Sequence, residues 1–463
     1  MQAAEQRAPA AGSFPPTSSR VRKVLVISFD FPPRRTSAVY RIKALTKYLV
    51  DCHWQPLVLT VQGPVQLWSP VELKEDPALL QGIPSQVRVV RTPIWRLLEW
   101  ESLASATVRR LGYLPSTDDG AGESCRDRWV RSAARRVRSL LYFPDASVGW
   151  IAPALRAAVE LHFEQRFDAI YTTSPPRAAT VVGLILHRIF GLPWVAEFMD
   201  PWYPPPGRIR RDLEHRLQAR VVRSADRVVV VTPGHADDLG DSFPVVDGKL
   251  AVIPNGYDEQ DFAGLPDPPP RPPGDKVHFS HFGTVYPGHS GEFFPALAEL
   301  VRESPGLRRR LQIDVVGFPD ETVRRFASPS ELGDVVRLHG YMPHEQALNA
   351  MYNSDALLLF LADAQFSRLA VSSKIYEYLR VGRPIVAVAY DGGVKRLIRE
   401  AQAGWVLPPD DRQAIKAAMH DLVCNGRTQL LADSRPQTEY AQQFRYDRLA
   451  QRLAQLLNSV VQP

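Results

Sequence analysis

The stretch Ser372–Val386, SSKIYEYLRVGRPIV, decides the fold class of this chain. Its first half carries apolar residues at a helical spacing, and a Gly-Arg-Pro turn then leads into an apolar run typical of a buried strand. The stretch therefore predicts a loop, a helix, a tight turn and a strand, which together form one unit of an α/β domain. Glu377 lies near the start of that helix, where a carboxylate packed toward a sheet needs a partner.

The same pattern recurs along the chain in two series. Continuous apolar strands that alternate with helices indicate parallel, doubly wound sheets. Because 463 residues exceed what a single core usually holds, we expect two large α/β domains. The expected strands are 24–28, 57–61, 87–90, 169–172, 194–197 and 228–232 in the first series and 277–282, 312–316, 335–338, 356–361 and 384–389 in the second; the expected helices include 178–190, 209–224, 291–304, 344–354, 373–381, 394–401 and 411–424.

The composition suits a globular protein of the reducing cytosol, and we expect a cytoplasmic location. Hydrophobic residues make up 45% of the chain, which argues against wholesale disorder, and the formal net charge of +6 suits acidic small molecules or a membrane surface. No signature of nucleic-acid recognition is present, so we expect no nucleic-acid partner. The three widely spaced cysteines give neither a disulfide framework nor a zinc site, and no apolar run is long enough to span a bilayer.

Ser372, Ser373 and Lys374 form a small-residue loop and the start of the expected helix. Helix N-termini carry unpaired N–H groups and a partial positive charge, so they favour phosphate, and Lys374 adds a full charge. Glu377, one turn further, can accept two hydrogen bonds from the vicinal hydroxyls of a ribose. The alternative is a capping box, with Ser373 or Lys374 as the cap, and the spacing alone leaves both interpretations open.

Asp200 follows the expected strand 194–197 and precedes a Pro-Trp pair. A carboxylate at the carboxyl end of a strand can orient or deprotonate an acceptor hydroxyl, and its alternative role is to cap a helix or form a turn. Glu197 either shares this role or belongs to a structural pair. Arg34, Arg35 and Arg41 are expected to meet acceptor or phosphate, with a solvated surface as the alternative for the first two.

Several short motifs occur in a fixed order from about Val24 to the end of the chain. They are Asp30-Phe-Pro-Pro33 followed by Arg41, Tyr171-Thr-Thr-Ser-Pro-Pro176, Gly191–Trp202, Ile253-Pro-Asn-Gly-Tyr-Asp258 with Phe262, His281-Phe-Gly-Thr-Val-Tyr286, Leu338-His-Gly340 with Pro343-His-Glu345, and Lys374 with Glu377, Gly382 and Pro384. Each motif is weak singly, but in this order they resemble a retaining glycosyltransferase of the large group 1 family (GT4), of the bacterial polysaccharide and glycoconjugate type.

The resemblance implies a GT-B fold, in which two Rossmann-like doubly wound parallel-sheet domains face a central cleft. It also implies transfer of a sugar from a nucleotide-diphosphate donor to an acceptor hydroxyl, with retention of anomeric configuration. No metal and no cofactor are expected, because basic side chains and helix dipoles would stabilise the leaving diphosphate. The implied site residues are Asp200, His289 and Lys374 for catalysis and Gly283, Thr284, Ser372, Ser373, Lys374 and Glu377 for binding the nucleotide-sugar.

The chain departs from the family pattern at two positions. Leu369 stands where a glutamate often touches the donor sugar, and His289 stands near the place of a usual arginine or lysine. A bound diphosphate would raise the pKa of His289 and let it supply the missing charge, or Arg368 or Arg383 can substitute. Two alternatives therefore stay open: a nucleotide-sugar 2-epimerase or hydrolase of the same fold, and a non-catalytic nucleotide-binding relative.

The two series of strands and helices, together with the resemblance, divide the chain into domains and connecting segments. Residues 1–20 are expected to be a disordered tail. Residues 91–147 interrupt the alternation of strands and helices with an arginine-rich amphipathic pattern. That basic insert is either a solvated helix or a peripheral contact with the inner face of the plasma membrane, where a lipid-linked acceptor would lie. The predicted domains are 21–245 for the acceptor domain, 246–433 for the nucleotide-sugar domain and 434–463 for a C-terminal helix that crosses back to the first domain.

Overall fold

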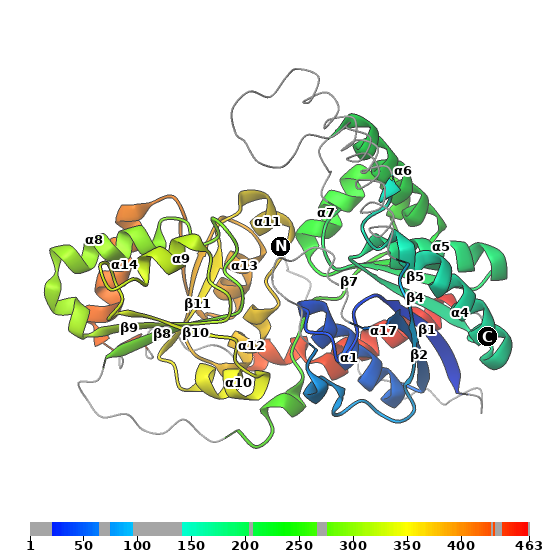
Figure 1. Cartoon of the computed structure of the whole chain (residues 1–463), viewed down its shortest axis with the longest axis horizontal. Helices are drawn as coiled ribbons and strands as arrows, with labels where there is room; N and C mark the ends of the chain where they lie inside the picture. The colour runs from blue at the N-terminus through cyan, green and yellow to red at the C-terminus, as the bar shows by residue number, and fades with distance from the viewer. Residues whose placement is uncertain are drawn as a thin grey trace, which may run out of the picture.

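The computed structural model describes residues 21–63, 75–95, 141–202, 207–265, 276–426, 429–430 and 438–461. The described part forms two lobes, each built on a sheet with helices on both faces (Figure 1). The first lobe has a 7-stranded sheet and the second a 6-stranded sheet, and every strand pair within them is parallel. The predicted pair of doubly wound α/β domains is confirmed.

The first sheet has the strand order β3-β2-β1-β4-β5-β6-β7. In β1, Val24 and Val26 pack on one face, whereas Leu25 and Ile27 pack on the other. Both faces are apolar because helices cover both, and this explains the continuous apolar run in the sequence. The elements are β1 (Arg22–Ser28), α1 (Ser37–Asp51), β2 (Trp54–Val61), β3 (Arg88–Thr92), α4 (Ile151–Gln165), β4 (Ala169–Ser174), α5 (Arg177–Phe190), β5 (Trp194–Phe198), α6 (Arg208–Ser224), β6 (Arg227–Val230), α7 (Pro233–Ser242) and β7 (Leu250–Val252).

The second sheet has the order β10-β9-β8-β11-β12-β13. In β11, Leu358 and Phe360 belong to the core on one face, and Leu357 and Leu359 belong to the core on the other. This lobe is therefore built in the same way as the first. Its elements are η4 (Glu259–Phe262), β8 (Val277–Phe282), α8 (Phe293–Glu303), β9 (Leu311–Val316), α9 (Glu321–Phe326), β10 (Val336–Gly340), α10 (His344–Tyr352), β11 (Ala356–Leu361), α11 (Ala364–Leu369), α12 (Lys374–Val381), β12 (Ile385–Ala389), α13 (Gly393–Glu400), β13 (Gly404–Leu407) and α14 (Arg412–Cys424).

Each expected strand and helix is present, with ends shifted by a few residues. The sequence pattern does not predict β7 and β13, because each is short, lies at a sheet edge and is mostly only half-buried. The tail 1–20, most of the insert 91–147 and the proline cluster 266–273 lie outside the described residues. Of the helices that are described, none is long and apolar enough to cross a membrane.

The chain passes between the lobes twice, and the two passages run side by side. Tyr257 and Arg445 form a parallel bridge between them, in which Tyr257 N donates to the Phe444 carbonyl at 3.1 Å. The Tyr257 carbonyl in turn accepts from Tyr446 N at 3.0 Å. A Cβ on Gly256 would collide with the Phe444 carbonyl, so this close approach requires glycine.

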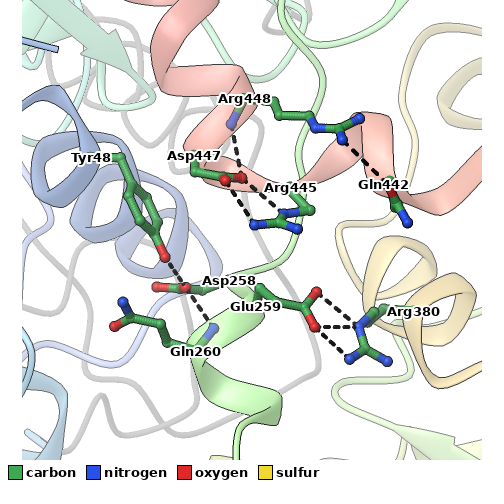
Figure 2. Close-up of polar contacts among 9 residues, drawn as sticks. All are labelled: Tyr48, Asp258, Glu259, Gln260, Arg380, Gln442, Arg445, Asp447 and Arg448. Atoms are coloured by element: carbon green, nitrogen blue, oxygen red, sulfur yellow. Dashed lines mark hydrogen bonds and ion pairs between the residues drawn. The ribbon is translucent and has the colours of Figure 1, made fainter. Parts of the chain in front are cut away.

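After the second passage the chain docks on the first domain. Helix α17 (Tyr446–Val460) packs against α1 and adds its apolar side to one face of the first sheet. Two short elements, α16 (Thr438–Ala441) and η6 (Gln442–Phe444), precede it, so the expected continuous helix is interrupted at Arg445. Asp447 accepts two hydrogen bonds from the Arg445 guanidinium and thereby fixes this break (Figure 2).

The first passage is anchored in both domains (Figure 2). Asp258 accepts a hydrogen bond from Tyr48 of α1 at 2.6 Å and forms an ion pair with Lys47. The next residue, Glu259, forms an ion pair with Arg380 of α12. Adjacent residues of the linker are therefore held by opposite lobes.

Arg41 lies beneath the linker, 1% exposed. Its Nη2 forms an ion pair with Glu197 Oε1 at 2.6 Å and donates to the Ile253 carbonyl at 2.9 Å, while Nη1 donates to the Pro254 carbonyl. The expectation that Arg41 meets acceptor or phosphate is therefore wrong, and Glu197 belongs to a structural pair. The pair joins α1 and β5 to the segment that leaves the first domain.

Replacing Arg41 by Met is expected to destabilise the first domain, because the Glu197 carboxylate is left buried without its partner. Removing one member of a buried ion pair costs about 3–5 kcal/mol. Urea unfolding followed by circular dichroism measures the loss. The matched control is Arg88→Met, which breaks the exposed Arg88–Glu164 pair of the same domain and should leave the unfolding midpoint unchanged. Equal effects of the two substitutions would contradict the importance of burial.

Candidate functional site

The two domains touch where the helices α7 and α11 meet. Thr232 Oγ1, at the start of α7, donates to the carbonyl of Leu369, and a Cβ on Gly234 would collide with the carbonyl of Arg368. In a parallel sheet, the carboxyl ends of all strands share one edge. The loops that follow β8 and β11, together with the start of α12, therefore lie on one edge of the second sheet, next to the first domain.

Gly283 and Lys374 lie against each other at this edge. Gly283 follows β8 with φ of 112°, a conformation that favours glycine, and a Cβ there would collide with Lys374 Cε. Gly283 N donates to the Val316 carbonyl at 2.7 Å, and the Gly283 carbonyl accepts from Phe318 N at 3.3 Å. The loop is thus fixed by its neighbour β9, and the space beside it is filled by the lysine stem.

The Lys374 ammonium has no hydrogen-bond or ion-pair partner in the part of the chain that the structure describes. Burial lowers the pKa of Lys374, while the nearby charge of Glu377 acts in the opposite direction. A desolvated ammonium without a counter-ion is unfavourable. This position therefore favours an anion placed beside Lys374.

Helix α12 begins at Lys374, with Ser373 as its N-cap residue, and the Ser373 side chain makes no capping hydrogen bond. Glu377 follows Lys374 by three residues and so lies beyond the third helical position. The capping-box interpretation of Glu377 is therefore wrong. Ser372 and Ser373 are half-buried at this start. Ile375 N and Tyr376 N donate to the carbonyls of Ser372 and Ser373, so the N–H groups that remain to favour an anion are those at the very beginning of the helix.

Glu377 is held by a histidine that the sequence analysis did not assign. Its Oε1 accepts from His344 Nε2 at 2.9 Å, and His344 Nδ1 lies 3.9 Å from Asp261 Oδ2. Glu377 Oε2 makes no hydrogen bond to any residue that the structure describes. His344 is part of the Pro343-His-Glu345 motif, but the linear pattern gives no sign that it reaches a carboxylate 33 residues away.

Tyr378 fixes α12 beneath the sheet and so sets the direction of its neighbour Glu377. The Tyr378 hydroxyl accepts from Phe282 N at 3.0 Å and donates to the Leu358 carbonyl at 3.3 Å. One buried side chain thereby joins the ends of β8 and β11 to the helix. The position of α12 is consequently fixed relative to two strands of the second sheet.

His289 and Thr284 lie in the loop after β8, and both are half-buried. The His289 carbonyl accepts from Ala362 N at 2.9 Å, which ties this loop to the segment between β11 and α11. Burial lowers the pKa of His289 in spite of the nearby charges of Asp363 and Asp320. His289 is therefore neutral near pH 7 unless an anion is bound beside it.

Asp200, at the end of β5, faces the second domain. Its side chain is open to solvent but closely surrounded by protein atoms, and this partial desolvation raises its pKa. Burial and, secondly, the charge of Asp200 raise the pKa of Tyr286, which lies in the loop that also carries Thr284. Asp200 therefore lies across the domain boundary from that loop.

Leu369 is 6% exposed and contributes its carbonyl to the contact between the domains. Of the two arginines considered as substitutes for a missing base, Arg383 donates to the carbonyl of Tyr352 at the far end of α10. Arg383 is therefore placed away from the start of α12. Arg368 is exposed on α11, at the contact with α7.

Within the described ranges, no group of three or more His, Cys, Asp or Glu side chains is arranged to hold a metal ion. His281 Nδ1 lies 3.1 Å from the Leu358 carbonyl and must carry the proton, because a carbonyl only accepts. Burial and then the charge of Lys374 lower the pKa of His281 to about 3, so the ring is neutral. His278 instead lies near Asp314, and the two histidines share no site.

Two family descriptions match this chain. Residues 103–261 match Glycosyltransferase Family 4, and residues 285–425 match Glycosyl transferases group 1. A D-inositol 3-phosphate glycosyltransferase from Streptomyces coelicolor is 24% identical over 273 residues, which cover 53% of this chain and 58% of that relative. The chain thus spans little more than half the length of this curated relative.

Solved structures of similar fold cover almost the whole chain. Anabaena Alr3699/HepE, in complex with UDP and glucose, has a TM-score of 0.58 at 16% identity and covers 95% of this chain and 100% of its own. The trehalose-6-phosphate synthase OtsA has a TM-score of 0.62 at 12% identity, with coverages of 95% and 99%. At such identity the likeness shows the fold alone, and it confirms the GT-B fold that the resemblance implied.

His344 and His289 are expected to titrate on opposite sides of the ordinary histidine pKa of about 6.5. Burial opposes the charge on both rings, but for His344 the hydrogen bond and charge of Glu377 outweigh burial and raise the pKa. The stability that His344 contributes is therefore complete below about pH 6.5 and is lost as the pH rises through the raised value.

NMR titration of the ring protons measures both pKa values. The variant Glu377→Gln removes the carboxylate charge next to His344 and serves as the comparison. It should lower the pKa of His344 and leave that of His289 unchanged. A His344 pKa that does not move in this variant would contradict the pairing.

Proposed function

Since the chain belongs to the GT4-type glycosyltransferases, we propose that it transfers a sugar from a nucleoside-diphosphate sugar to an acceptor hydroxyl. The observation that carries the proposal is the Lys374 ammonium, which no described residue pairs with and which is packed on Gly283 beside a start of α12 that no serine side chain caps. A diphosphate supplies the anion that this arrangement lacks. Glu377, one turn along, offers its free Oε2 to the ribose. The fold neighbour that holds UDP and glucose supports this class of donor.

The proposed chemistry is stabilisation of a leaving group. The bond between the anomeric carbon and the diphosphate oxygen breaks, and the bonding electrons leave with the diphosphate. Lys374, the amides at the start of α12 and the Gly283–Thr284 loop face the charge that grows there, and donors fixed in advance lower the barrier. No divalent metal takes part in this proposal, because these donors balance the charge.

His289 and Asp200 complete the proposed machinery. The arriving diphosphate raises the pKa of His289, so that the imidazolium adds a second positive charge to the site. Asp200 approaches from the first domain, orients the acceptor hydroxyl and takes its proton, and its raised pKa makes it a stronger base. The acceptor oxygen forms the new bond to the anomeric carbon, with retention of configuration.

The acceptor is proposed to be a lipid-linked intermediate of polysaccharide or glycoconjugate assembly, and the sugar a hexose. The motifs at 171–176 and 191–202, which resemble the polysaccharide type, support this choice. Contact of residues 91–147 with an anionic membrane is part of the same proposal, and flotation with liposomes, with and without that segment, tests it. Product analysis distinguishes transfer from hydrolysis or 2-epimerisation, which release or isomerise the sugar without an acceptor.

Replacing Lys374 by Met is expected to weaken binding of nucleoside diphosphates by roughly tenfold to a hundredfold, which corresponds to about 1.5–3 kcal/mol for a charged hydrogen bond. Calorimetry with UDP, GDP and ADP measures the dissociation constants, and the diphosphate that binds the wild type is used. The matched control, Lys395→Met, removes an exposed lysine of α13 that pairs with Asp391. Equal affinities of wild type and Lys374→Met would overturn the proposed diphosphate site.

Replacing Gly283 by Ala is expected to abolish the same binding, because the new Cβ would collide with the Lys374 stem and displace its ammonium. The matched control is Gly382→Ala, at the end of α12. Gly382 also has a positive φ, of 74°, but nothing lies within 4 Å of its added Cβ. Both substitutions strain the backbone, so only the collision separates them. Equal loss of nucleotide binding in the two variants would contradict the role of the glycine–lysine contact.

A further inference from the structure

His344 stands where three parts of the molecule meet. It begins α10, its Nε2 donates to Glu377 of α12, and its Nδ1 faces Asp261 of the linker element η4. The ring of Tyr40, from α1 of the first domain, packs on the imidazole with centroids 4.9 Å apart. One side chain thus contacts the proposed ribose carboxylate, the linker and the opposite lobe.

Both ring nitrogens of His344 face carboxylate oxygens, at 2.9 Å and 3.9 Å. A neutral imidazole has one donor and one acceptor nitrogen, and its acceptor would repel one of these carboxylates. The imidazolium has two donors and satisfies both. Burial and the Lys43 ammonium of α1 oppose the charge, but Glu377 and Asp261 prevail and raise the pKa of His344.

The hydrogen bond also determines which part of Glu377 is left for a ligand. Oε1 is occupied by His344 Nε2, so the carboxylate cannot turn freely, and Oε2 is held in one direction. Side chains behind a binding residue commonly act in this way, since they fix the rotamer and keep the binding group ionised. The His344 contacts therefore act on the geometry of Glu377 and not on the ligand itself.

We propose that His344, as an imidazolium, is the positioning residue that holds Glu377 ready for the vicinal hydroxyls of the nucleotide ribose and links that contact to the domain linker. The inference rests on the proposed function, since it requires a ribonucleotide at Glu377. It has a consequence for pH. Recognition of the ribose is strongest while His344 is protonated and weakens as the pH rises through its pKa.

The linkage to domain arrangement follows from what surrounds Asp261. Three residues earlier, Asp258 is held by Tyr48 of α1, and Glu259 is held by Arg380 of α12 (Figure 2). Lys47 of α1 also forms an ion pair with Asp258. A ribose bound to Glu377 therefore acts, through His344, on the same short segment that both lobes grip. A change in that contact reaches the linker through the hydrogen bond between Glu377 and His344 and the ion pair between His344 and Asp261.

The test measures the affinity ratio between a nucleoside diphosphate and its 2′,3′-dideoxy analogue, because this ratio isolates the ribose contact from the diphosphate and from His289. UDP and GDP are used with their dideoxy counterparts, by calorimetry at pH 6.5 and pH 8.5. For the wild type we expect a ratio of about tenfold at pH 6.5, falling at pH 8.5. In His344→Gln, which keeps a neutral donor, we expect a smaller ratio that does not depend on pH.

Two further variants sharpen the test. His339→Gln is the matched control, since His339 also pairs with a carboxylate, Asp314, at 2.7 Å but lies away from Glu377, and it should behave as the wild type. Asp261→Asn removes one of the two carboxylates and should shift the loss of ribose discrimination to lower pH. This second variant leaves α10 unchanged and serves if His344→Gln folds poorly, which circular dichroism reveals.

The outcomes separate the two levels of the proposal. If neither UDP nor GDP binds the wild type, the proposed function itself fails for these donors. If a nucleotide binds in a manner that depends on Glu377, but His344→Gln shows the ratio and pH profile of the wild type, the function stands and the positioning role is overturned. A pH-dependent ratio that is lost in His344→Gln and retained in His339→Gln supports the role.

Discussion

The candidate site is arranged around one constraint, a positive charge to which no residue in the described ranges supplies a counter-ion. The Lys374 ammonium is desolvated because its stem lies on the bare backbone of Gly283, and Tyr378 pins the helix that carries it to two strands. Tyr378 contributes to the core of the free protein, whereas the position of the Lys374 ammonium does not. An unpaired buried charge costs free energy, and that cost is offset only when an anion completes the site. The arrangement therefore supports the proposed binding of an anion at Lys374.

At the connection between the lobes, the buried charges are paired with one another, unlike the charge of Lys374. Arg41 and Glu197 are fully buried, but they are paired, and the arginine also satisfies carbonyl groups at the point where the chain leaves the first domain. The linker that follows is held at Asp258 by one lobe and at Glu259 by the other. Buried charge is thus neutralised within the protein at the linker, whereas at Lys374 we propose that a ligand neutralises it.

The sequence predicts most of the strands and the two-domain α/β architecture well, because a sheet covered on both faces leaves continuous apolar runs such as 24–28 and 356–361. It fails where burial is incomplete, as at the edge strands β7 and β13. In the site, the spacing around Lys374 and Glu377 identifies the helix start. It does not identify His344, whose contact with Glu377 depends on how α10 packs on α12, nor the burial of Arg41, whose partner lies 156 residues away. Side chains that meet only through tertiary packing leave no local signal.

The docking of α17 on α1 has a consequence for how the protein is made. Leu449, Leu453 and Leu457 belong to the same apolar cluster as Val24 and Val26, so the first lobe lacks part of its core until helix α17, which follows the whole second lobe, has been synthesised. One face of the nascent sheet stays uncovered while the whole second lobe emerges. With this chain topology, we therefore expect that a chaperone or temporary packing protects that apolar surface during translation.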